Sequence, residues 1–239
     1  MQYIKIIFSL FEMPRTKEEL LELIPQSWKM VLQQELTKPY WDDIIKALNK
    51  SDKFFPPFKD IFNALCDVTP DGVKVVMIGQ DPYPTQGVAH GYSFSVRKDT
   101  DIPASLKNIF KELGLEYKTK FSPSNGDLRR WEKDGVLLLN SILTVEEHTP
   151  LAHKGIGWEN FTKAILQYLA TKKNVVFLTL GTKSRDVIKD LSIDQKQIVS
   201  AGHPSPRNLS NTFIGSDCFI RVNEILLSKN ILPVRWLLL

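Results

Sequence analysis

The sequence predicts a single-domain α/β protein in which a central, mainly parallel four-stranded sheet is flanked by helices on both faces. Four short runs rich in valine, isoleucine and leucine recur along the 239 residues, and continuous apolar runs of this kind are typical of buried parallel strands. Amphipathic segments with helical spacing lie between the runs, which is the order of elements in α/β proteins. The length and the 43% hydrophobic content are sufficient for one sizeable core.

The individual elements follow from local spacing. The predicted strands are Val73–Ile78, Val136–Leu139, Val175–Leu180 and Ile198–Ala201, and the predicted helices between them include Ser105–Leu113 and Glu159–Ala170.

A further helical pattern lies near the N-terminus. It spans Ser27–Leu36, with Ser27 placed as an N-cap, and it resumes over Trp41–Leu48 after Pro39 breaks it. We interpret residues 1–24 as an N-terminal extension and residues 25–239 as the folded domain. The apolar start, Met1–Phe11, is too short for a membrane helix and lacks a signal-peptide cleavage site.

The composition indicates a soluble globular protein with a net charge of +4. That excess is compatible with a polyanionic partner, although most proteins with such a charge simply have a basic surface. Cys66 and Cys218 form no C-x-x-C pair, so we predict no zinc site. Two thiols favour a reducing compartment: the cytoplasm if the source is bacterial, or a nucleus, including that of a host cell, if it is eukaryotic or viral.

Polar residues follow three of the predicted strands. Asp81 comes shortly after the first, Asn140 ends the second, and His203 follows the fourth. Ligands of open parallel sheets bind at the carboxyl ends of the strands. We therefore expect these three side chains to meet in one cleft.

Each of the three has a chemical interpretation and an ordinary one. Asp81, on a proline-stiffened turn, suits a general base or an anion that stabilises a cation, although aspartate is also common in turns. The Asn140 amide can match a pyrimidine edge that presents a carbonyl beside an N–H, or it can anchor a loop. A lone histidine is more often structural, and His203 becomes a candidate because of the edge it shares.

An aromatic residue and three loops are weaker candidates. Phe94 lies in the strand-like alternation Gly91–Val96 and could be a core residue or a platform on which a base stacks. The proline-rich loops could grip phosphates or be plain turns; they are Phe55-Pro56-Pro57, Ile102-Pro103-Ala104-Ser105 and His203-Pro204-Ser205-Pro206.

Taken together, these segments resemble the family 1 uracil-DNA glycosylases from about Trp28 to Trp236. Any one match is weak, but five in order at compatible spacing are very specific. The matching segments are Gly79-Gln80-Asp81-Pro82-Tyr83-Pro84 with Gly87-Val88-Ala89-His90-Gly91, then Leu137-Leu138-Leu139-Asn140-Ser141, then Ala152-His153 with Gly157-Trp158-Glu159-Asn160-Phe161-Thr162, then His203-Pro204-Ser205-Pro206, and finally Phe213-Ile214-Gly215.

The resemblance implies excision of uracil from DNA, single- or double-stranded, by a monomer that needs no metal or organic cofactor and no membrane. Asp81 would orient the attacking water and stabilise the cationic sugar, and a neutral His203 would hydrogen-bond uracil O2. Asn140 would read the N3 and O4 edge. The other implied contacts are stacking by Phe94, exclusion of the thymine methyl by Tyr83, help at the base from the Gln80 backbone, and phosphate contacts by Pro56, Pro57, Ser105 and Ser205.

Two positions depart from the family pattern. Pro84 replaces a histidine, and Arg207 replaces the leucine that wedges into the gap left by the flipped base; we hypothesise that Arg207 or Leu209 fills that gap. Both departures favour an alternative, a catalytically weakened DNA-binding homologue such as a polymerase partner, which the three intact polar residues disfavour. A third alternative is a related glycosylase with a changed base preference, and Tyr83 argues against it because the resemblance implies that this residue excludes thymine. The resemblance also suggests a DNA-mimic protein inhibitor as a partner.

Overall fold

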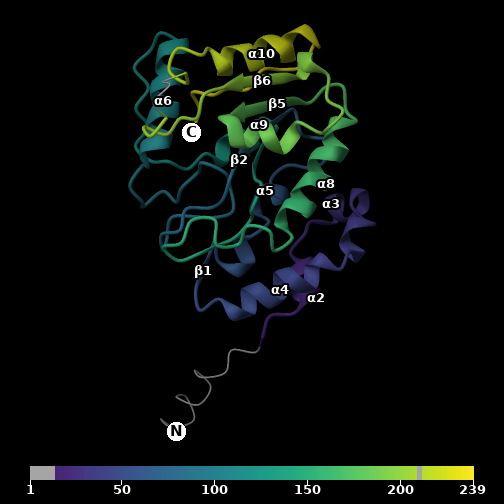
Figure 1. Ribbon diagram of the computed structural model, residues 1–239. Coiled ribbons are helices and arrows are strands. Elements are labelled where there is room, and N and C mark those ends of the chain that lie inside the picture. Colours follow the sequence, from purple (N-terminus) through teal and green to yellow (C-terminus); the bar gives the residue numbers. More distant parts are fainter. Residues whose placement is uncertain (1–13, 209–211) are drawn as a thin grey trace.

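The computed structural model describes residues 14–208 and 212–239, and its centre is a four-stranded parallel sheet in the order β3-β2-β5-β6 (Figure 1). The inner strands and β3 are buried along their whole length, which explains their continuous apolar sequences. The strands are β2 (Val75–Gly79), β3 (Val136–Asn140), β5 (Val176–Leu180) and β6 (Ile198–Ala201).

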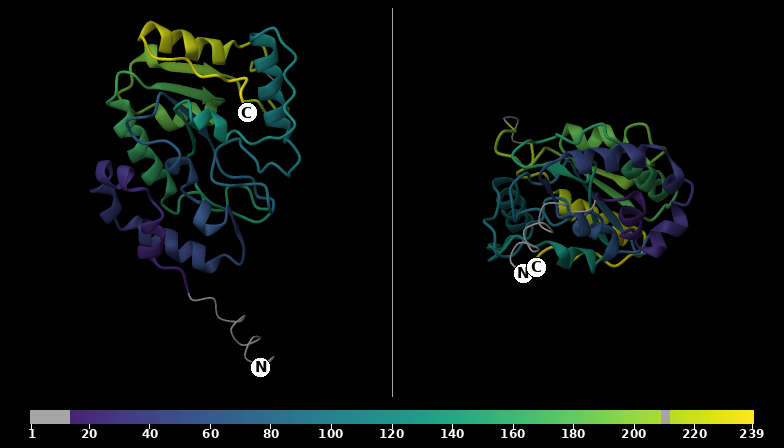
Figure 2. Two further views of the ribbon diagram at one scale, coloured as in Figure 1. Left: turned by 180° about the vertical axis from the view of Figure 1, so that it is seen from behind. Right: turned by 90° about the horizontal axis from the view of Figure 1, so that it is seen from below.

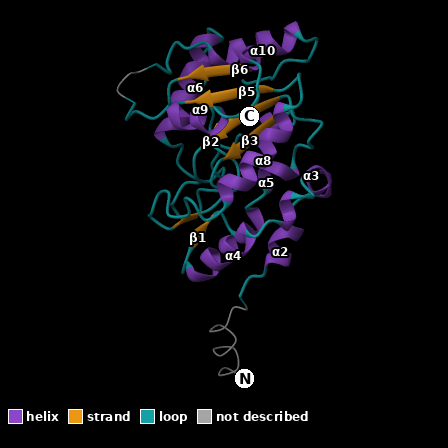
Figure 3. Ribbon diagram, turned by 45° about the vertical axis from the view of Figure 1, so that its right-hand side comes forward, coloured by secondary structure: helices purple, strands orange, loops and turns teal. Residues whose placement is uncertain are grey.

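Helices cover both faces of this sheet (Figure 3). The chain crosses over between parallel strands through these helices, and α6 packs on α10 while α8 packs on α9. These helices are α6 (Ala104–Glu116), α7 (Arg129–Glu132), α8 (Trp158–Ala170), α9 (Thr182–Ile188) and α10 (Cys218–Ser228).

The N-terminal elements lie at the end of the molecule opposite α10 (Figure 2). A short antiparallel pair, β1 (Phe54–Phe55) and β4 (Val145–Glu146), lies beside them. The helices of this part are α2 (Lys17–Glu22), α3 (Gln26–Val31), α4 (Tyr40–Lys50) and α5 (Asn63–Cys66), with 3₁₀ turns at Glu35–Thr37 and Phe58–Asp60 and a later one at Gln195–Gln197. None of the helices in the described ranges is both long and apolar enough to cross a membrane.

Aromatic side chains fill the space between these helices and the sheet. On one side Trp41 packs edge-on against Trp158 and Phe161, with ring centroids 6.1 and 5.0 Å apart. Elsewhere in the core Trp131 packs edge-on against Trp236, at 5.0 Å. Because aromatic side chains bury the largest apolar areas, these clusters hold the sheet and its loops in place.

The four predicted strands are confirmed, with ends displaced by at most two residues. The predicted helix over Ser27–Leu36 was wrong in its bounds, because Pro25 occupies the N-cap position and the helix ends at Val31. The strand-like reading of Gly91–Val96 was also wrong: this segment is irregular, since Phe94 has a left-handed backbone (φ 62°) that interrupts an extended chain.

The predicted N-terminal extension contains an ordered helix. Thr16 caps α2 through a capping box with Glu19, and Leu20 and Ile24 are buried in the main core. The predicted apolar start at Met1–Phe11 lies outside the described residues.

Candidate active site

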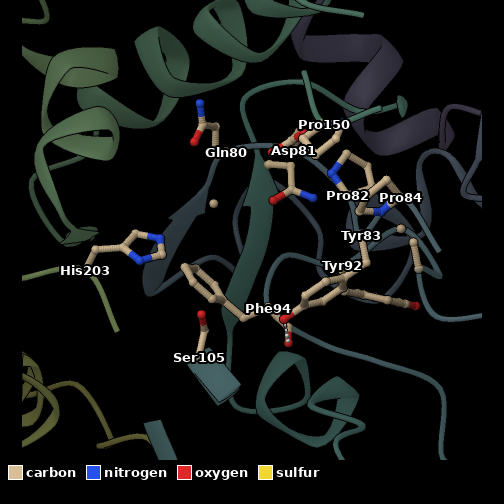
Figure 4. Close-up of a pocket in the computed structure, with 14 residues that line it drawn as sticks. Gln80, Asp81, Pro82, Tyr83, Pro84, Tyr92, Phe94, Ser105, Pro150 and His203 are labelled. Carbon is tan, nitrogen blue, oxygen red and sulfur yellow. Dashed lines mark hydrogen bonds between the residues drawn. The ribbon is translucent and has the colours of Figure 1, made fainter. Parts of the chain in front are cut away.

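A cavity of about 220 Å³ opens at the carboxyl ends of the parallel strands, and it is small enough to suit one flat ring rather than a drug-sized ligand. Figure 4 shows Asp81, Phe94 and His203 approaching this space from separate segments of the chain. Its walls consist of Gly79, Gln80, Asp81, Pro82, Tyr83, Pro84, Ala89, Gly91, Tyr92, Phe94, Ser105, Asn140, Pro150 and His203.

Asp81 supplies a carboxylate at one wall. It lies two residues after the end of β2, and its Oδ2 accepts a hydrogen bond from the backbone N–H of Leu151 at 2.8 Å. Leu151 reaches this position with a left-handed backbone (φ 64°). Burial raises the pKa of Asp81, and the Leu151 N–H opposes that rise. A carboxylate with a raised pKa is a stronger proton acceptor than a solvated one.

His203 supplies an imidazole of defined tautomer. The backbone N–H of Ser205 donates to His203 Nδ1 at 3.0 Å, so Nδ1 carries no proton and the proton of the neutral ring is on Nε2. Burial lowers the pKa of His203, which keeps the ring neutral at pH 7. A Cβ on Gly181 would lie 2.8 Å from the His203 Cβ, so the close approach of this loop requires glycine at 181.

Asn140 supplies an amide from the last residue of β3. In the sheet it pairs with Gly79 of β2, and a Cβ on Gly79 would lie 2.2 Å from Asn140 Oδ1 and 2.7 Å from the Cβ of Ser93. The absence of a side chain at 79 therefore creates the space that the amide occupies. Asn140 is 7% exposed as a residue, so its side chain is largely shielded from solvent.

Phe94 and Tyr83 present aromatic rings to the cavity (Figure 4). The Phe94 ring lies 6.3 Å from the His203 ring, centroid to centroid. The Tyr83 hydroxyl donates to the Phe94 carbonyl at 3.2 Å, which ties the two aromatic segments together. A left-handed backbone at a bulky residue costs about 1–3 kcal/mol and persists where the surroundings impose it. Tertiary contacts therefore hold the Phe94 backbone in this conformation.

Residues 66–227 of the chain match the family model described as "Uracil DNA glycosylase superfamily". It belongs to the uracil-DNA glycosylase superfamily.

Relatives in this superfamily cover almost the same length. The chain is 41% identical over 213 residues to the uracil-DNA glycosylase of Borrelia duttonii (strain Ly), covering 87% of this chain and 95% of the relative. It is 42% identical over 217 residues to that of Buchnera aphidicola subsp. Acyrthosiphon pisum (strain Tuc7), covering 89% and 99%.

Solved structures of the superfamily share the architecture. The crystal structure of mimivirus uracil-DNA glycosylase superposes with a TM-score of 0.84 at 27% identity, covering 91% of this chain and 88% of the viral one. A mimivirus UNG variant in complex with UGI also gives a TM-score of 0.84 at 27% identity, covering 91% and 90%.

In this uracil-DNA glycosylase superfamily member the cavity brings together most of the base-contacting residues expected from the sequence. Asp81, His203, Asn140, Phe94 and Tyr83 all line it. Gln80 lines it too, while its carbonyl is occupied by the backbone N–H of Ile142 at 2.9 Å and by the Ser141 hydroxyl at 2.9 Å.

The expected phosphate contacts are more dispersed. Ser105 lines the cavity at the start of α6, whereas Pro56, Pro57, Ser205 and Arg207 lie outside its wall. Pro57 and Arg207 are exposed, and the Ser205 hydroxyl accepts from the Arg207 N–H at 3.2 Å. The predicted wedge residue Leu209 falls outside the described residues. The proposed roles of these positions stay predictions.

Three contributors were not identified from the sequence. Pro150 and Tyr92 line the cavity, and the Leu151 backbone N–H binds Asp81. Pro150 and Leu151 lie in an irregular loop whose sequence carries no periodic signal, and a backbone donor leaves no side-chain signature. Tyr92 lies directly after the motif ending at Gly91, and that position was the available clue.

Proposed function

We propose that this chain is a monofunctional uracil-DNA glycosylase, which hydrolyses the N-glycosidic bond of uracil in DNA, releases the free base and leaves an abasic site for base excision repair. The observation that carries this proposal is the convergence of Asp81, Asn140 and His203 on one cavity beside the Phe94 ring. A base inside a duplex is out of reach of such a cavity, so the nucleotide must be flipped out of the stack.

Two walls account for selection of uracil. The fixed Asn140 amide matches a carbonyl beside an N–H, and cytosine would present like groups to it and leave buried polar atoms unpaired. Tyr83, half-buried and tied to the Phe94 carbonyl, supplies a rigid block against the methyl group of thymine. Exclusion by a rigid wall discriminates better than the loss of one favourable contact.

The remaining two side chains account for catalysis. Departure of the base leaves negative charge on uracil and positive charge on the sugar. The Nε2–H of neutral His203 is suited to donate to the developing oxyanion at O2, and one such donor contributes about 10²–10³-fold in rate. The Asp81 carboxylate is suited to orient and deprotonate water and to stabilise the cationic sugar.

The alternative of a weakened DNA-binding homologue rests on Pro84 and Arg207. The first lines the cavity and the second is exposed on a loop, and neither displaces a group needed for the steps above. The tautomer of His203 and the Leu151–Asp81 hydrogen bond support the hydrolase.

The test is strand cleavage of a labelled uracil-containing oligonucleotide by alkali after incubation with the protein. We expect cleavage by the parent and a loss of at least about 10²-fold in the Asp81→Asn and His203→Ala variants. Asp71→Asn is the matched control, because Asp71 is an exposed acid before the start of β2. Cleavage by the two site variants at the parent rate, or no cleavage by the parent, would refute the proposal.

We further propose that the enzyme acts as a monomer on uracil in single- or double-stranded DNA, and that DNA-mimic inhibitor proteins bind the same face. The proposal of an inhibitor draws on the mimivirus UNG complex with UGI. A reducing compartment, bacterial cytoplasm or a nucleus, is proposed as the location, in keeping with the free thiols of Cys66 and Cys218.

A further inference from the structure

One face of α6 carries polar side chains that the proposed mechanism does not use. Ser105, Asn108, Glu112 and Glu116 are spaced by three, four and four residues, so they lie on the same face of the helix. Glu112 is fully buried and Glu116 is 8% exposed, which is rare for carboxylates unless their oxygens are bound.

The two carboxylates bind backbone N–H groups of the chain that follows the His203 loop. Glu112 accepts hydrogen bonds from Gly215, Ser216 and Asp217 at 2.6, 2.8 and 3.0 Å. Glu116 accepts from Phe219 and Ile220, in the first turn of α10, at 3.2 and 2.8 Å. Carboxylates at these positions satisfy N–H groups that a helix N-terminus leaves without partners.

Asn108 binds the other end of the same loop. Its Nδ2 donates to the carbonyl of Pro204 at 2.7 Å, and Pro204 directly follows His203. The base of the loop is closed by the Gly202 N–H, which donates to the Thr212 carbonyl at 3.1 Å. Asn108 and Glu112, one helical turn apart, therefore fix the loop at two points, the Pro204 carbonyl and the Gly215 N–H.

We propose that Asn108 is a positioning residue that holds the His203 imidazole at the cavity through the Pro204 carbonyl, with Glu112 anchoring the return of the same loop. The role in catalysis rests on the proposed function, whereas the role in placing the ring does not. Because Ser105 lines the cavity from the first turn of α6, the helix couples the position of the cavity wall to that of the imidazole.

The size of the effect follows from geometry. Removing the Asn108 donor leaves the buried Pro204 carbonyl without its bond and frees the backbone next to His203. A displacement of about 1 Å at a reacting group lowers the rate about 10²-fold. We therefore expect Asn108→Ala and Asn108→Asp to lower the single-turnover rate on a uracil oligonucleotide about 10- to 100-fold, with KM changing less than about threefold. Asp keeps the shape of Asn but lacks its donor.

A double-mutant comparison separates positioning from general loosening. In a His203→Ala background the Asn108 variants should lower the single-turnover rate no further, because the imidazole that Asn108 positions is absent. In an Asp81→Asn background they should lower that rate about 10- to 100-fold, as in the parent. Leu115→Ala is the control for a change on α6, since Leu115 is exposed on that helix, and melting temperatures identify variants that fail to fold.

A second readout does not depend on activity. The chain has four histidines, and ¹⁵N NMR, assigned with His203→Ala, reports the tautomer of each ring. We expect Asn108→Asp to shift the His203 nitrogen signals and to leave those of His90 and His153 in place. Unchanged His203 signals together with additive costs in both backgrounds would overturn the proposal even if the parent excises uracil. Shifted signals in a parent without glycosylase activity would support positioning and refute the proposed function alone.

Discussion

Replacing Gly79 by alanine should disable base recognition while leaving the fold intact. The new Cβ would lie 2.2 Å from Asn140 Oδ1, whereas ordinary contacts begin at 3.4 Å, so the amide oxygen must retreat by about 1.2 Å. The Cβ of Ser93, at 2.7 Å on the other side, prevents the new methyl group from moving away. Because a misplacement of about 1 Å costs roughly 10²-fold, we expect a loss of about 100-fold in kcat/KM, or about 2.7 kcal/mol of transition-state stabilisation.

The assay is single-turnover excision from a uracil oligonucleotide, with the melting temperature measured in parallel. Overpacking costs about 1–3 kcal/mol of folding stability, so Gly79→Ala should melt a few degrees lower yet remain folded. Gly72→Ala is the matched control, because its nearest atoms lie at 3.1 Å or more and it precedes β2 instead of following it. A folded Gly79→Ala protein that excises uracil at the parent rate would refute the reasoning that Gly79 makes room for the amide.

Four further predictions test the walls and rim of the cavity. Tyr83→Ala should begin to excise thymine while still excising uracil, and thymine-containing oligonucleotides that stay intact would contradict the steric role of Tyr83. Because burial raises the pKa of Asp81, kcat/KM should fall as pH drops through a value above the ordinary 3.8, and this limb should disappear from the residual activity of Asp81→Asn; a limb that persists there belongs to another group. Arg207→Ala and Leu209→Ala, singly and together, should slow excision from duplex more than from single strands, and equal rates for all variants would remove both as wedges. Pro84→His should excise uracil at an equal or higher rate. A large loss of turnover in this variant would contradict the interpretation that the site merely lacks an accessory histidine at position 84.

The sheet and the convergence of its polar residues could be predicted from the sequence because both depend on local patterns. Buried parallel strands are continuous in apolar residues, and the topology then carries Asp81, Asn140 and His203 to one edge. The wrong strand at 91–96 shows the limit of such patterns. Alternating apolar and polar residues suggested extension, but the left-handed backbone of Phe94 is imposed by tertiary contacts, including the hydrogen bond from the Tyr83 hydroxyl to its carbonyl.

Groups that act through the backbone could not be predicted in the same way. The Leu151 N–H that binds Asp81 and the Ser205 N–H that fixes the His203 tautomer are available from any residue other than proline at those positions. Their directions depend on loop conformations set by distant contacts. The burial of Glu112 could not be predicted either, because a charged residue on an amphipathic helix is expected to face solvent. Its hydrogen-bond partners are backbone N–H groups that begin at Gly215, 103 residues further along the chain.

The folding energetics of the site follow from the sign of the Asp81 shift. A carboxyl group whose pKa is higher in the folded state than in the unfolded one penalises the native state once it is ionised, so the cost is absent at low pH and present at pH 7. Backbone N–H groups, that of Leu151 first among them, offset part of this cost, and no ion pair to Asp81 is present among the described residues. A neighbouring cation would lower the pKa and weaken the carboxylate as a base. Asp81→Asn should therefore be at least as stable as the parent at pH 7 while losing activity, and this divergence of stability from rate is what distinguishes a carboxylate retained for chemistry from one retained for folding.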